Sequence, residues 1–507
     1  MTRRPIVISL LAVLCIAPML SAAKSTTNIT SKYFDSIRDN PSLLRSFLFR
    51  FPKGGDLHNH LDGAIYAENY IAWAAEDGKC VDLETNTITM PPCDADENRP
   101  AVTDIQFDAD KVNRLIDAFS VRNYERRAVS GHDQFFATFT RYLVASFGRE
   151  GSMIAEVSQR AATQNVLYLE LMQSFGMHAA RELARASKSF SPAQSMSDQI
   201  QNKDLNRIVK ETIAATNLAE RQSRKELGCD RDASAAGCGV TVRYLAQVIR
   251  TFPRDQVLAQ TLLAYKLIEQ DPRYVGLNFV APEDHPITLR DHKWQMEIIQ
   301  KIGANFPAAK DRIALHAGEL AMGLVAPEEL RSHISEAVKI AGARRIGHGV
   351  DIVHEWDSEE LLLLMAEQGI AVEVNLTSNA VILGIDGDEH PFTSYRAHGV
   401  PVLLSTDDEG VSRIDLTHEY QRAVQTYDLS YADIKEFSRN ALAFSFLQGE
   451  DLFSNVAKGK IVRACARDHA AQKPPSGDCQ LFLENNEKAL LQWQLETRFI
   501  EFESAYR

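Results

Sequence analysis

Eight short apolar runs alternate with segments of helical character along this chain, and this alternation constrains its fold more than any other feature. Several runs are uniformly apolar or rich in β-branched residues, as strands buried on both faces must be. Segments between them, such as 335–343 and 358–368, carry apolar residues at helical spacing and end near glycine or a basic residue. The predicted strands are residues 53–58, 166–172, 241–249, 274–280, 312–315, 345–347, 371–375 and 401–404. Eight strands alternating with helices predict an α/β fold of the TIM-type (β/α)8 barrel class.

Polar islands follow the first, fifth, sixth and eighth predicted strands. They read His58-Asn59-His60, His316-Ala317-Gly318-Glu319, Gly347-His348-Gly349 and Thr406-Asp407-Asp408. Barrel enzymes carry their chemistry at the carboxyl ends of the strands, where these islands would meet. The sequence therefore predicts a functional site at one mouth of the barrel.

The islands supply a set of metal ligands. His58 and His60 lie two apart on a strand, so both side chains face the same side. An H-x-H pair alone is a weak signal. With His316 and Asp407 it completes a set of three nitrogens and one oxygen, which is typical of a catalytic zinc that keeps a position open for water. Zinc can lower the pKa of that water to about 7.

Three further island residues suit acid–base chemistry. Glu319 follows His316 closely enough to act as a general acid on a heterocycle, and His348 could orient or deprotonate the water. Asp408 would face another part of the pocket and must be protonated if it donates to a ring nitrogen. Alone, His348 reads as a structural histidine and Asp407-Asp408 as a helix cap. Their conjunction favours the metal site.

Other enzyme classes lack their signatures. The chain contains no C-x-x-C pair for a cytidine-type zinc deaminase, no H-E-x-x-H for a metalloprotease and no G-x-S-x-G for a serine hydrolase. Its formal net charge of −13 disfavours a nucleic-acid polymer as partner, because phosphate contacts need clustered lysine and arginine.

The first residues resemble a signal peptide. Arg3 and Arg4 precede an apolar stretch, and Ser21-Ala22-Ala23 offers small residues for cleavage, so we assign residues 1–23 to the signal. An uncleaved N-terminal anchor is the alternative. We expect an exported protein, periplasmic or extracellular, with no stable membrane insertion after cleavage. No particular oligomeric state is predicted.

Six of the seven cysteines lie beyond the signal, in three local pairs that bracket polar, turn-rich stretches. An even count in an exported chain favours disulfides over the alternative of a cysteine metal site, although six cysteines allow fifteen pairings. The expected pairs are Cys80 with Cys93, Cys229 with Cys238 and Cys465 with Cys479.

The domain plan has four parts. After the signal come a helical segment at 24–50, a barrel at 51–447 with inserts at about 80–129 and 181–238, and a helical extension at 448–507. In the extension, apolar residues at helical spacing would dock on the protein's own core or form an oligomer contact.

The islands and their flanks resemble the adenosine deaminase family of the metal-dependent amidohydrolases, as an exported member, over roughly residues 51–447. The matching segments are Gly55-Asp56-Leu57-His58-Asn59-His60-Leu61-Asp62-Gly63, Leu315-His316-Ala317-Gly318-Glu319, Arg345-Ile346-Gly347-His348-Gly349 and Ser405-Thr406-Asp407-Asp408. The family fold is a TIM-type barrel, which agrees with the strand pattern.

The resemblance implies hydrolytic deamination of adenosine and 2′-deoxyadenosine at C6 of the purine, giving inosine and ammonia from adenosine. One Zn²⁺ per chain would be held by His58, His60, His316 and Asp407, and zinc-bound hydroxide would attack C6. Glu319 would protonate N1, His348 would act on the zinc-bound water, Asp408 would contact N7, and Asp62 a ribose hydroxyl. At the position of Asp62, adenine-specific relatives resemble a variant with glutamate. The aspartate of this chain therefore favours a purine nucleoside as the small-molecule partner.

Two positions depart from the family pattern. Ala281 stands where a glycine usually offers its N–H to purine N3, and Glu409 follows Asp408 where proline is common. We expect catalysis to persist and substrate preference to shift. The alternatives are a deaminase of another aminopurine or modified nucleoside, and a non-catalytic exported protein that binds a nucleoside. The second would be marked by loss of a ligand or of the acid, and all seven positions are filled.

Overall fold

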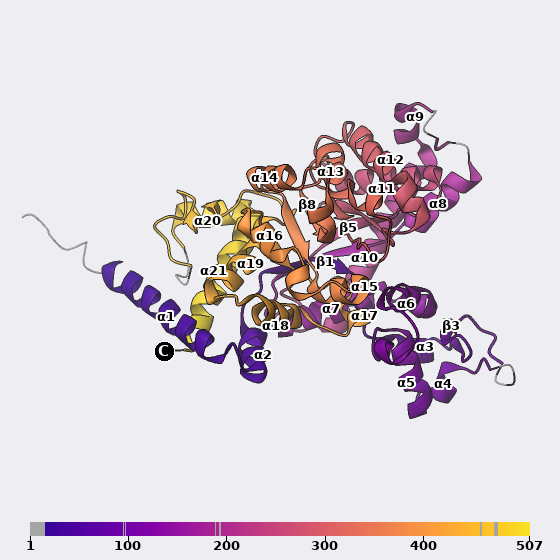
Figure 1. The fold of residues 1–507 in the computed structure, drawn as a ribbon, viewed down its shortest axis with the longest axis horizontal. Coiled ribbons are helices and arrows are strands. Elements are labelled where there is room, and N and C mark those ends of the chain that lie inside the picture. The colour runs from indigo at the N-terminus through magenta and orange to yellow at the C-terminus, as the bar shows by residue number, and fades with distance from the viewer. Residues whose placement is uncertain are drawn as a thin grey trace, which may run out of the picture.

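The computed structural model describes residues 16–94, 96, 98–187, 189–191, 194–456, 459–470 and 475–506. Its centre is a ring of parallel strands with helices around it (Figure 1). The ring consists of β1 (Gly55–His60), β4 (Tyr168–Gln173), β5 (Thr241–Ile249), β6 (Tyr274–Val280), β7 (Ala314–Ala317), β8 (Arg345–His348), β9 (Ala371–Val374) and β10 (Val402–Leu404).

Two four-stranded sheets make up the ring, one in the order β1-β4-β5-β6 and the other in the order β7-β8-β9-β10. Isolated parallel bridges, Leu277 to Ile313 and Asn59 to Asp407, join the two sheets at both seams. The strands therefore close into a barrel, and the predicted TIM-type fold is confirmed.

Each predicted strand coincides with a barrel strand, but several ends shift by up to two residues. As a result His58 and His60 lie inside β1, His316 lies inside β7, and His348 is the last residue of β8. Only the Thr406-Asp407-Asp408 island follows its strand, β10. Apolar residues do not mark where a strand ends, because backbone pairing continues past the last apolar side chain.

Helices cover the outside of the barrel between successive strands. Their ends follow local signals: Asn202 accepts from the first turn of α10 and Gly228 ends it at φ +77°, while Ser430 and Asp433 cap each other at the start of α19. The layer contains α6 (Gly131–Ser146), α7 (Glu150–Thr163), α8 (Met177–Ala186), α10 (Lys203–Leu227), α11 (Arg254–Gln270), α12 (Pro286–Gly303), α13 (His333–Glu336) with the π-helical turn η3 (Ala337–Ala341), α14 (Ser358–Gln368), α15 (Leu376–Leu383), α16 (Phe392–Ala397), α17 (Glu409–Ser412), α18 (Leu416–Tyr427) and α19 (Tyr431–Ala443). Short helical turns η2 (Pro327–Leu330), η4 (Val350–His354) and η5 (Gly387–Glu389) lie in loops.

The stretch after β1 projects from the barrel at the lower right of Figure 1. It contains α3 (Ala67–Glu76), the hairpin β2 (Cys80–Asp82) and β3 (Thr87–Thr89), α4 (Val102–Ile105), α5 (Ala109–Ala118) and η1 (Tyr124–Arg126). The stretch at 181–238 holds the end of α8, α9 (Met196–Ile200) and α10. Helix α10 packs on α7 and α11, so much of this second stretch belongs to the outer layer of the barrel.

Both ends of the described chain pack on one side of the barrel. Helices α1 (Ile16–Ile37) and α2 (Pro41–Arg50) begin it, and β11 (Phe453–Asn455), β12 (Lys460–Ile461), α20 (Gly477–Asn485) and α21 (Glu487–Ser504) end it. The apolar stripe of α21 is buried: Phe499 and Phe502 contact Phe51, which precedes β1. Of the two alternatives for this stripe, the structure shows docking on the protein's own core. Residues 1–15 of the predicted signal lie outside the described residues, and 16–23 fall in α1.

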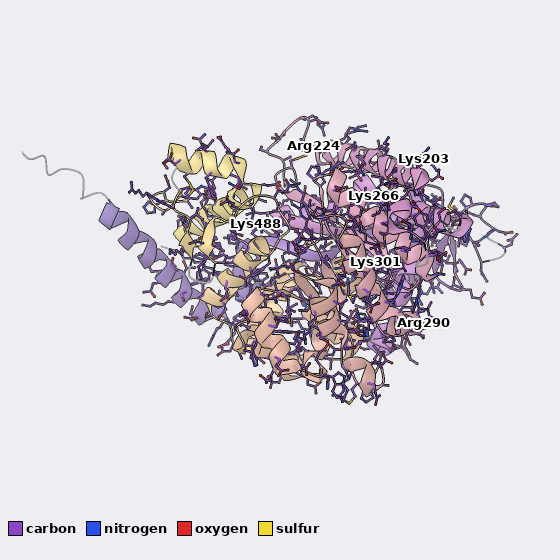
Figure 2. All side chains as sticks on the ribbon, turned by 90° about the horizontal axis from the view of Figure 1, so that it is seen from above. Lys203, Arg224, Lys266, Arg290, Lys301 and Lys488 are labelled. Atoms are coloured by element: carbon purple, nitrogen blue, oxygen red, sulfur yellow. A yellow bond between two sulfur atoms is a disulfide. The ribbon has the colours of Figure 1, made fainter. Side chains whose placement is uncertain are left out.

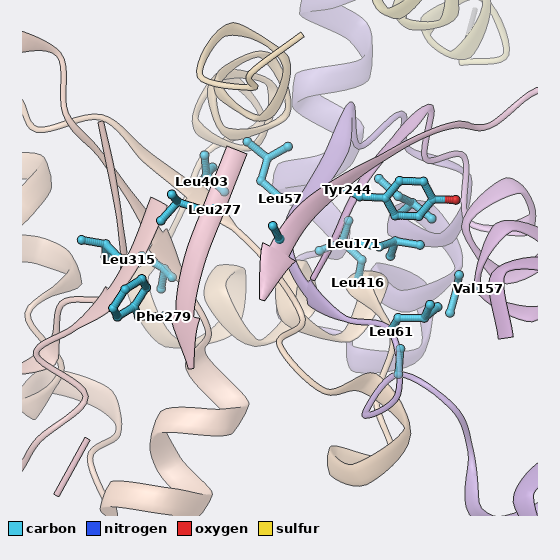
Figure 3. Close-up of a cluster of buried hydrophobic side chains, with 14 of the residues drawn as sticks. Leu57, Leu61, Val157, Leu171, Tyr244, Leu277, Phe279, Leu315, Leu403 and Leu416 are labelled. Atoms are coloured by element: carbon cyan, nitrogen blue, oxygen red, sulfur yellow. The ribbon is translucent and has the colours of Figure 1, made fainter. Parts of the chain in front are cut away.

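One hydrophobic cluster runs from the barrel strands into the surrounding helices, with Leu57, Leu171, Leu315 and Leu403 among its buried members (Figure 3). The three expected cysteine pairs are all joined as disulfides, Cys80–Cys93, Cys229–Cys238 and Cys465–Cys479. Among the described residues, no helix combines the length and apolar character that a membrane crossing requires.

Candidate active site

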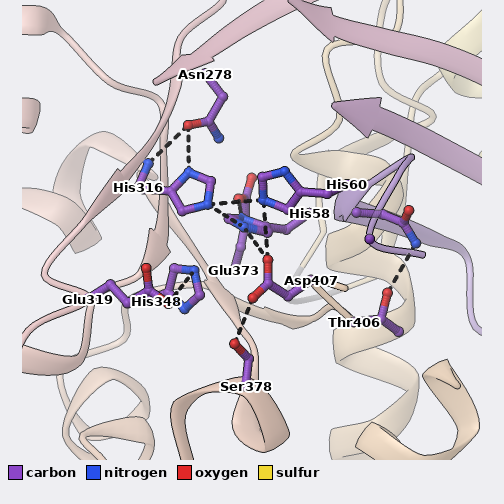
Figure 4. A network of polar contacts seen from close by, with 12 residues as sticks. His58, His60, Asn278, His316, Glu319, His348, Glu373, Ser378, Thr406 and Asp407 are labelled. Carbon is purple, nitrogen blue, oxygen red and sulfur yellow. Dashed lines mark hydrogen bonds and ion pairs between the residues drawn. The ribbon is translucent and has the colours of Figure 1, made fainter. Parts of the chain in front are cut away.

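The four predicted metal ligands meet at the carboxyl ends of the strands. His58 Nε2 lies 3.1 Å and His60 Nε2 3.2 Å from His316 Nε2, and both lie 3.3 Å from Asp407 Oδ1 (Figure 4). All four residues are at most 8% exposed. Ligands 2.0–2.1 Å from a tetrahedral ion lie about 3.3 Å from one another, so the spacing fits a single metal ion.

Each histidine has a partner on its other ring nitrogen. His58 Nδ1 lies 2.6 Å from Glu373, His60 Nδ1 2.9 Å from Gln247, and His316 Nδ1 2.8 Å from Asn278, in each case from a side-chain oxygen. These oxygens accept, so the ring protons lie on Nδ1 and three Nε2 lone pairs face one another. Lone pairs this close, beside a buried carboxylate, repel unless a cation lies among them. The donor chemistry therefore fits a metal ion.

A line of buried charges extends from the ligand His58 into the barrel. Glu373 accepts from His58 and also from Arg345 Nε at 2.5 Å, and Arg345 Nη2 donates to Glu170 at 2.5 Å. All four side chains are fully buried. Arg345 donates to both glutamates, and its positive charge helps to keep Glu373 ionised and able to hold the His58 ring in place.

Glu319 lies beside the four predicted metal ligands, and its backbone N–H is held by Glu283. The Glu283 carboxylate accepts from the backbone N–H of Gly318 and of Glu319 at 2.9 Å each, and from His333 Nδ1 at 2.6 Å. Burial first, and then the negative charges of Asp407 and Glu283, raise the pKa of Glu319 well above its usual value. This shift favours the protonated form of Glu319, which is the form that can act as an acid.

Glu283, His292 and His333 form a second buried group with metal-type donors. Although burial opposes it, the hydrogen bond from His333 and the charge of Arg250 hold the pKa of Glu283 below its usual range. The Glu283 oxygens are already taken by three protein donors, so this group acts as a scaffold for the turn that carries Glu319.

His348 faces Glu319 across the site, with its Nε2 3.5 Å from Glu319 Oε1. His348 is the last residue of β8, and its backbone φ of +67° lies in the left-handed region, so the chain turns at this residue. Burial lowers the pKa of His348 to about 3, so the imidazole is neutral at ordinary pH.

Asp408 and the Asp62–Gly63 loop lie against each other. A Cβ on Gly63 would sit 1.4 Å from Asp408 Oδ1, so only glycine allows this approach. Burial first, and then the charge of neighbouring Asp407, raise the pKa of Asp408 well above its usual value, which favours the protonated carboxyl. Burial also raises the pKa of Asp62.

Ala281 adopts a φ of +95°, a conformation that glycine tolerates and alanine resists. Its carbonyl accepts a forked pair of bonds from Arg250, from Nε at 3.1 Å and Nη2 at 3.0 Å. The third arm of Arg250, Nη1, donates to the His316 carbonyl at 3.2 Å. The buried Arg250 guanidinium thus holds both Ala281 and β7, the strand that carries His316.

A pocket of about 400 Å³ opens above these residues. Its lining includes His60, His316, Glu319, Asp407 and Asp408, together with Asp62, Gln247 and Ala281. Aromatic and aliphatic side chains form the remaining wall: Phe135, Phe136, Phe139, Leu143, Ile249 and Val280. An apolar cavity with a few convergent polar groups suits a flat heterocyclic ligand.

Every residue predicted for the site lines this pocket except His58 and His348. Both lie beside lining residues, His58 Nε2 3.1 Å from His316 Nε2 and His348 Nε2 3.5 Å from Glu319 Oε1. The sequence reasoning missed the residues that hold the predicted ones: Gln247, Asn278, Arg250, Glu283, Glu373, Ser378 and Asn379. Ser378 Oγ donates to Asp407 Oδ2 at 2.6 Å, for example. A lone charged residue inside a strand buried on both faces, such as Glu373, is the one signal that could have revealed some of them.

Comparison with known proteins agrees with this geometry. The sequence model of the family described as adenosine deaminase matches residues 102–458. The adenosine deaminase of Clostridium perfringens is 24% identical over 396 residues, which is 78% of this chain and 94% of that protein.

Solved structures show the same fold. An adenine deaminase from Arthrobacter aurescens superposes with a TM-score of 0.51 at 16% identity, covering 78% of this chain and 94% of that one. The N6-methyl-AMP deaminase of Arabidopsis thaliana gives 0.50 at 21% identity, covering 80% and 94%. The family match spans well over half of the sequence, and this chain belongs to the adenosine deaminase family.

Proposed function

We propose that this protein deaminates adenosine and 2′-deoxyadenosine by hydrolysis at C6 of the purine. For adenosine, water supplies the oxygen of inosine and the amino group leaves as ammonia. The observation that carries this proposal is the convergence of three Nε2 atoms and a carboxylate close to Glu319, whose pKa is raised, at a pocket with a largely apolar lining. Membership of the family supports it.

The metal is proposed to be one Zn²⁺, held by His58, His60, His316 and Asp407. Three imidazoles and one carboxylate are the donors that a catalytic zinc prefers. When bound, the ion would polarise a water molecule and lower its pKa.

The remaining residues act on the purine. Glu319, protonated and buried, donates its proton to N1, which makes C6 more electrophilic. Asp408 is likewise protonated and donates to N7. The Ala281 N–H is proposed to face N3, and Asp62 a ribose hydroxyl.

The pocket favours a nucleoside over a nucleotide. None of the residues lining it is lysine or arginine, and it contains the carboxyl groups of Asp62, Glu319, Asp407 and Asp408. A phosphate would find no cation there. The basic side chains labelled in Figure 2 lie instead on outer helices, Lys203 and Arg224 on α10 and Arg290 and Lys301 on α12.

The test is the fall in absorbance near the adenosine maximum when the purified protein meets adenosine, 2′-deoxyadenosine, adenine, AMP or N6-methyladenosine. We expect the two nucleosides named first to react fastest. Glu319→Gln is the control: it keeps the shape, cannot supply the acid, and should slow turnover by about 10²–10⁴-fold. Turnover of adenine or AMP alone would contradict the substrate proposed here.

We also propose that the protein is exported. The pattern of Arg3, Arg4 and the apolar stretch up to Ala23 supports a signal, and the three disulfides suit an oxidising compartment. N-terminal sequencing of the mature protein from each cell fraction tests this. A cytoplasmic protein that retains Met1 would contradict it.

A further inference from the structure

His348 has one ring nitrogen directed at the site and one directed away from it. Nε2 lies 3.5 Å from Glu319 and, within the described chain, has no hydrogen-bond partner, while Nδ1 lies 2.8 Å from the Asn379 amide nitrogen. A neutral imidazole carries its proton on only one of the two nitrogens. Which one carries it decides whether His348 donates a hydrogen bond into the site or accepts a proton there.

The answer begins at a group whose role is fixed. The backbone N–H of Phe392, at the start of α16, donates to His390 Nδ1 at 3.1 Å. A backbone N–H can only donate, so His390 Nδ1 must be unprotonated. Burial lowers the pKa of His390 to about 4, so the ring is neutral and its single proton lies on Nε2.

The next step fixes the Asn379 amide. His390 Nε2 lies 3.1 Å from Asn379 Oδ1, and since Nε2 carries the proton, Oδ1 accepts it. The NH₂ group of the same amide is then turned the other way, toward His348 Nδ1. Nδ1 of His348 accepts that bond, and its ring proton therefore lies on Nε2.

We propose that His390 and Asn379 are positioning residues that fix His348 in the Nε2–H form, so that His348 donates a hydrogen bond to the attacking oxygen and does not take its proton. The role at the oxygen rests on the proposed function. The chain of hydrogen bonds from Phe392 to His348 does not.

Burial keeps this series of hydrogen bonds in a single arrangement. Asn379, His348 and His390 are at most 1% exposed, so bulk water cannot exchange for any of their partners. Asn379 also follows Ser378, whose hydroxyl is bonded to Asp407, so α15 holds the metal ligand and the His348 ring together.

The test is ¹⁵N NMR of the full-length mature protein labelled at histidine nitrogens, with the His348 signals assigned by loss in His348→Gln. We expect a protonated Nε2 and a bare Nδ1. Asn379→Asp replaces the amide donor by an acceptor of nearly identical shape, so Nδ1 should become protonated. Turnover of adenosine should fall by about 10²-fold or more, with metal content unchanged.

Asn375→Asp makes the same chemical change four residues earlier, at the N-terminus of α15, and should leave the His348 signals as in the wild type. His390→Phe removes the donor to Asn379, frees the amide to turn and should yield signals of both tautomers. A protonated Nδ1 in the wild type, or an unchanged His348 spectrum in both Asn379→Asp and His390→Phe, would overturn the proposal. A wild type that shows Nε2–H yet deaminates no purine would refute the proposed function and leave the positioning role standing.

Discussion

At the scale of single residues, three residues of the candidate site have a strained backbone. Ala281, His348 and Asp407 all adopt positive φ without being glycine, at +95°, +67° and +61°. Such conformations cost about 1–3 kcal/mol each and persist only where the surrounding structure imposes them. Here Arg250 holds Ala281, Asn379 holds His348, and Ser378 holds Asp407. The strained backbone directs these residues into the site.

Ala281→Gly should make the protein more stable. Glycine adopts a φ of +95° without the clash that Cβ introduces, so we expect the free energy of unfolding to rise by about 1 kcal/mol. Urea unfolding measures it. The control is Ala214→Gly, at an exposed position inside α10, where the greater freedom of glycine in the unfolded chain should lower stability by about 1 kcal/mol. A less stable Ala281→Gly protein would show that the methyl group contributes more than the strain costs.

Glu283→Gln should slow turnover without releasing the metal. Glutamine has one acceptor oxygen in place of two, so one of the N–H groups of Gly318 and Glu319 loses its partner and faces an NH₂ group. A displacement of the Glu319 carboxyl should lower kcat by about 10–100-fold, with KM little changed. Steady-state kinetics and metal analysis test this. Glu336→Gln, which loses a bond to His292 but does not reach the turn, should stay close to wild type.

At the scale of elements, the sequence predicted the barrel strands better than the side chains that hold the site residues in place. Apolar runs that alternate with helical segments located all eight barrel strands, because a strand buried on both faces must be apolar almost throughout. The side chains that orient the site were not predictable in the same way. Ser378 and Asn379 lie on a short helix, and nothing in Leu376-Thr377-Ser378-Asn379 distinguishes them from an ordinary first turn. Their roles depend on which strands lie beside that helix.

The C-terminal helix α21 should contribute to the stability of the barrel. Phe499 is 1% exposed, lies 5.6 Å from the Phe51 ring between centroids, and has the Lys435 ammonium 4.6 Å from its own ring. Phe499→Ala should therefore lower the free energy of unfolding by about 3–5 kcal/mol. Denaturant titration measures this loss. Ile500→Ala, next along the helix and 36% exposed, should cost less than about 1 kcal/mol. Equal losses in the two variants would mean that α21 does not pack as described.

At the scale of the whole molecule, the metal ion should act as a structural tie as well as a reagent. Its four ligands come from β1, β7 and the loop after β10, so one ion would join the two four-stranded sheets of the barrel. At a free metal concentration 100–1,000 times its dissociation constant, binding would stabilise the folded chain by about 3–4 kcal/mol.

Removing the metal should therefore lower the melting temperature, and restoring Zn²⁺ should recover it. Differential scanning calorimetry before and after chelation tests this. Glu373→Gln, which weakens the support of His58, should bind the ion about 10–100-fold more weakly. An unchanged melting temperature after chelation, in protein shown by metal analysis to have lost its ion, would contradict the assignment of these ligands.

Two buried histidines should each make a contribution to stability that is lost in acid. Burial, with neighbouring positive charge from His333 and Arg422 respectively, lowers the pKa of His292 and of His390 to about 4, against an ordinary value near 6.5. Between pH 6.5 and 4 the unfolded chain therefore binds protons at these two histidines that the folded chain does not bind, so their contribution to stability falls as pH falls. Each histidine accounts for about 3 kcal/mol over that interval.

Urea unfolding of the metal-free protein from pH 7.5 to 4.5 measures the slope of stability against pH. His292→Gln removes one titrating group and should flatten the slope, whatever it does to stability at pH 7.5, whereas exposed His178→Gln should not. An unchanged slope in His292→Gln would show that this ring is already protonated in the folded protein.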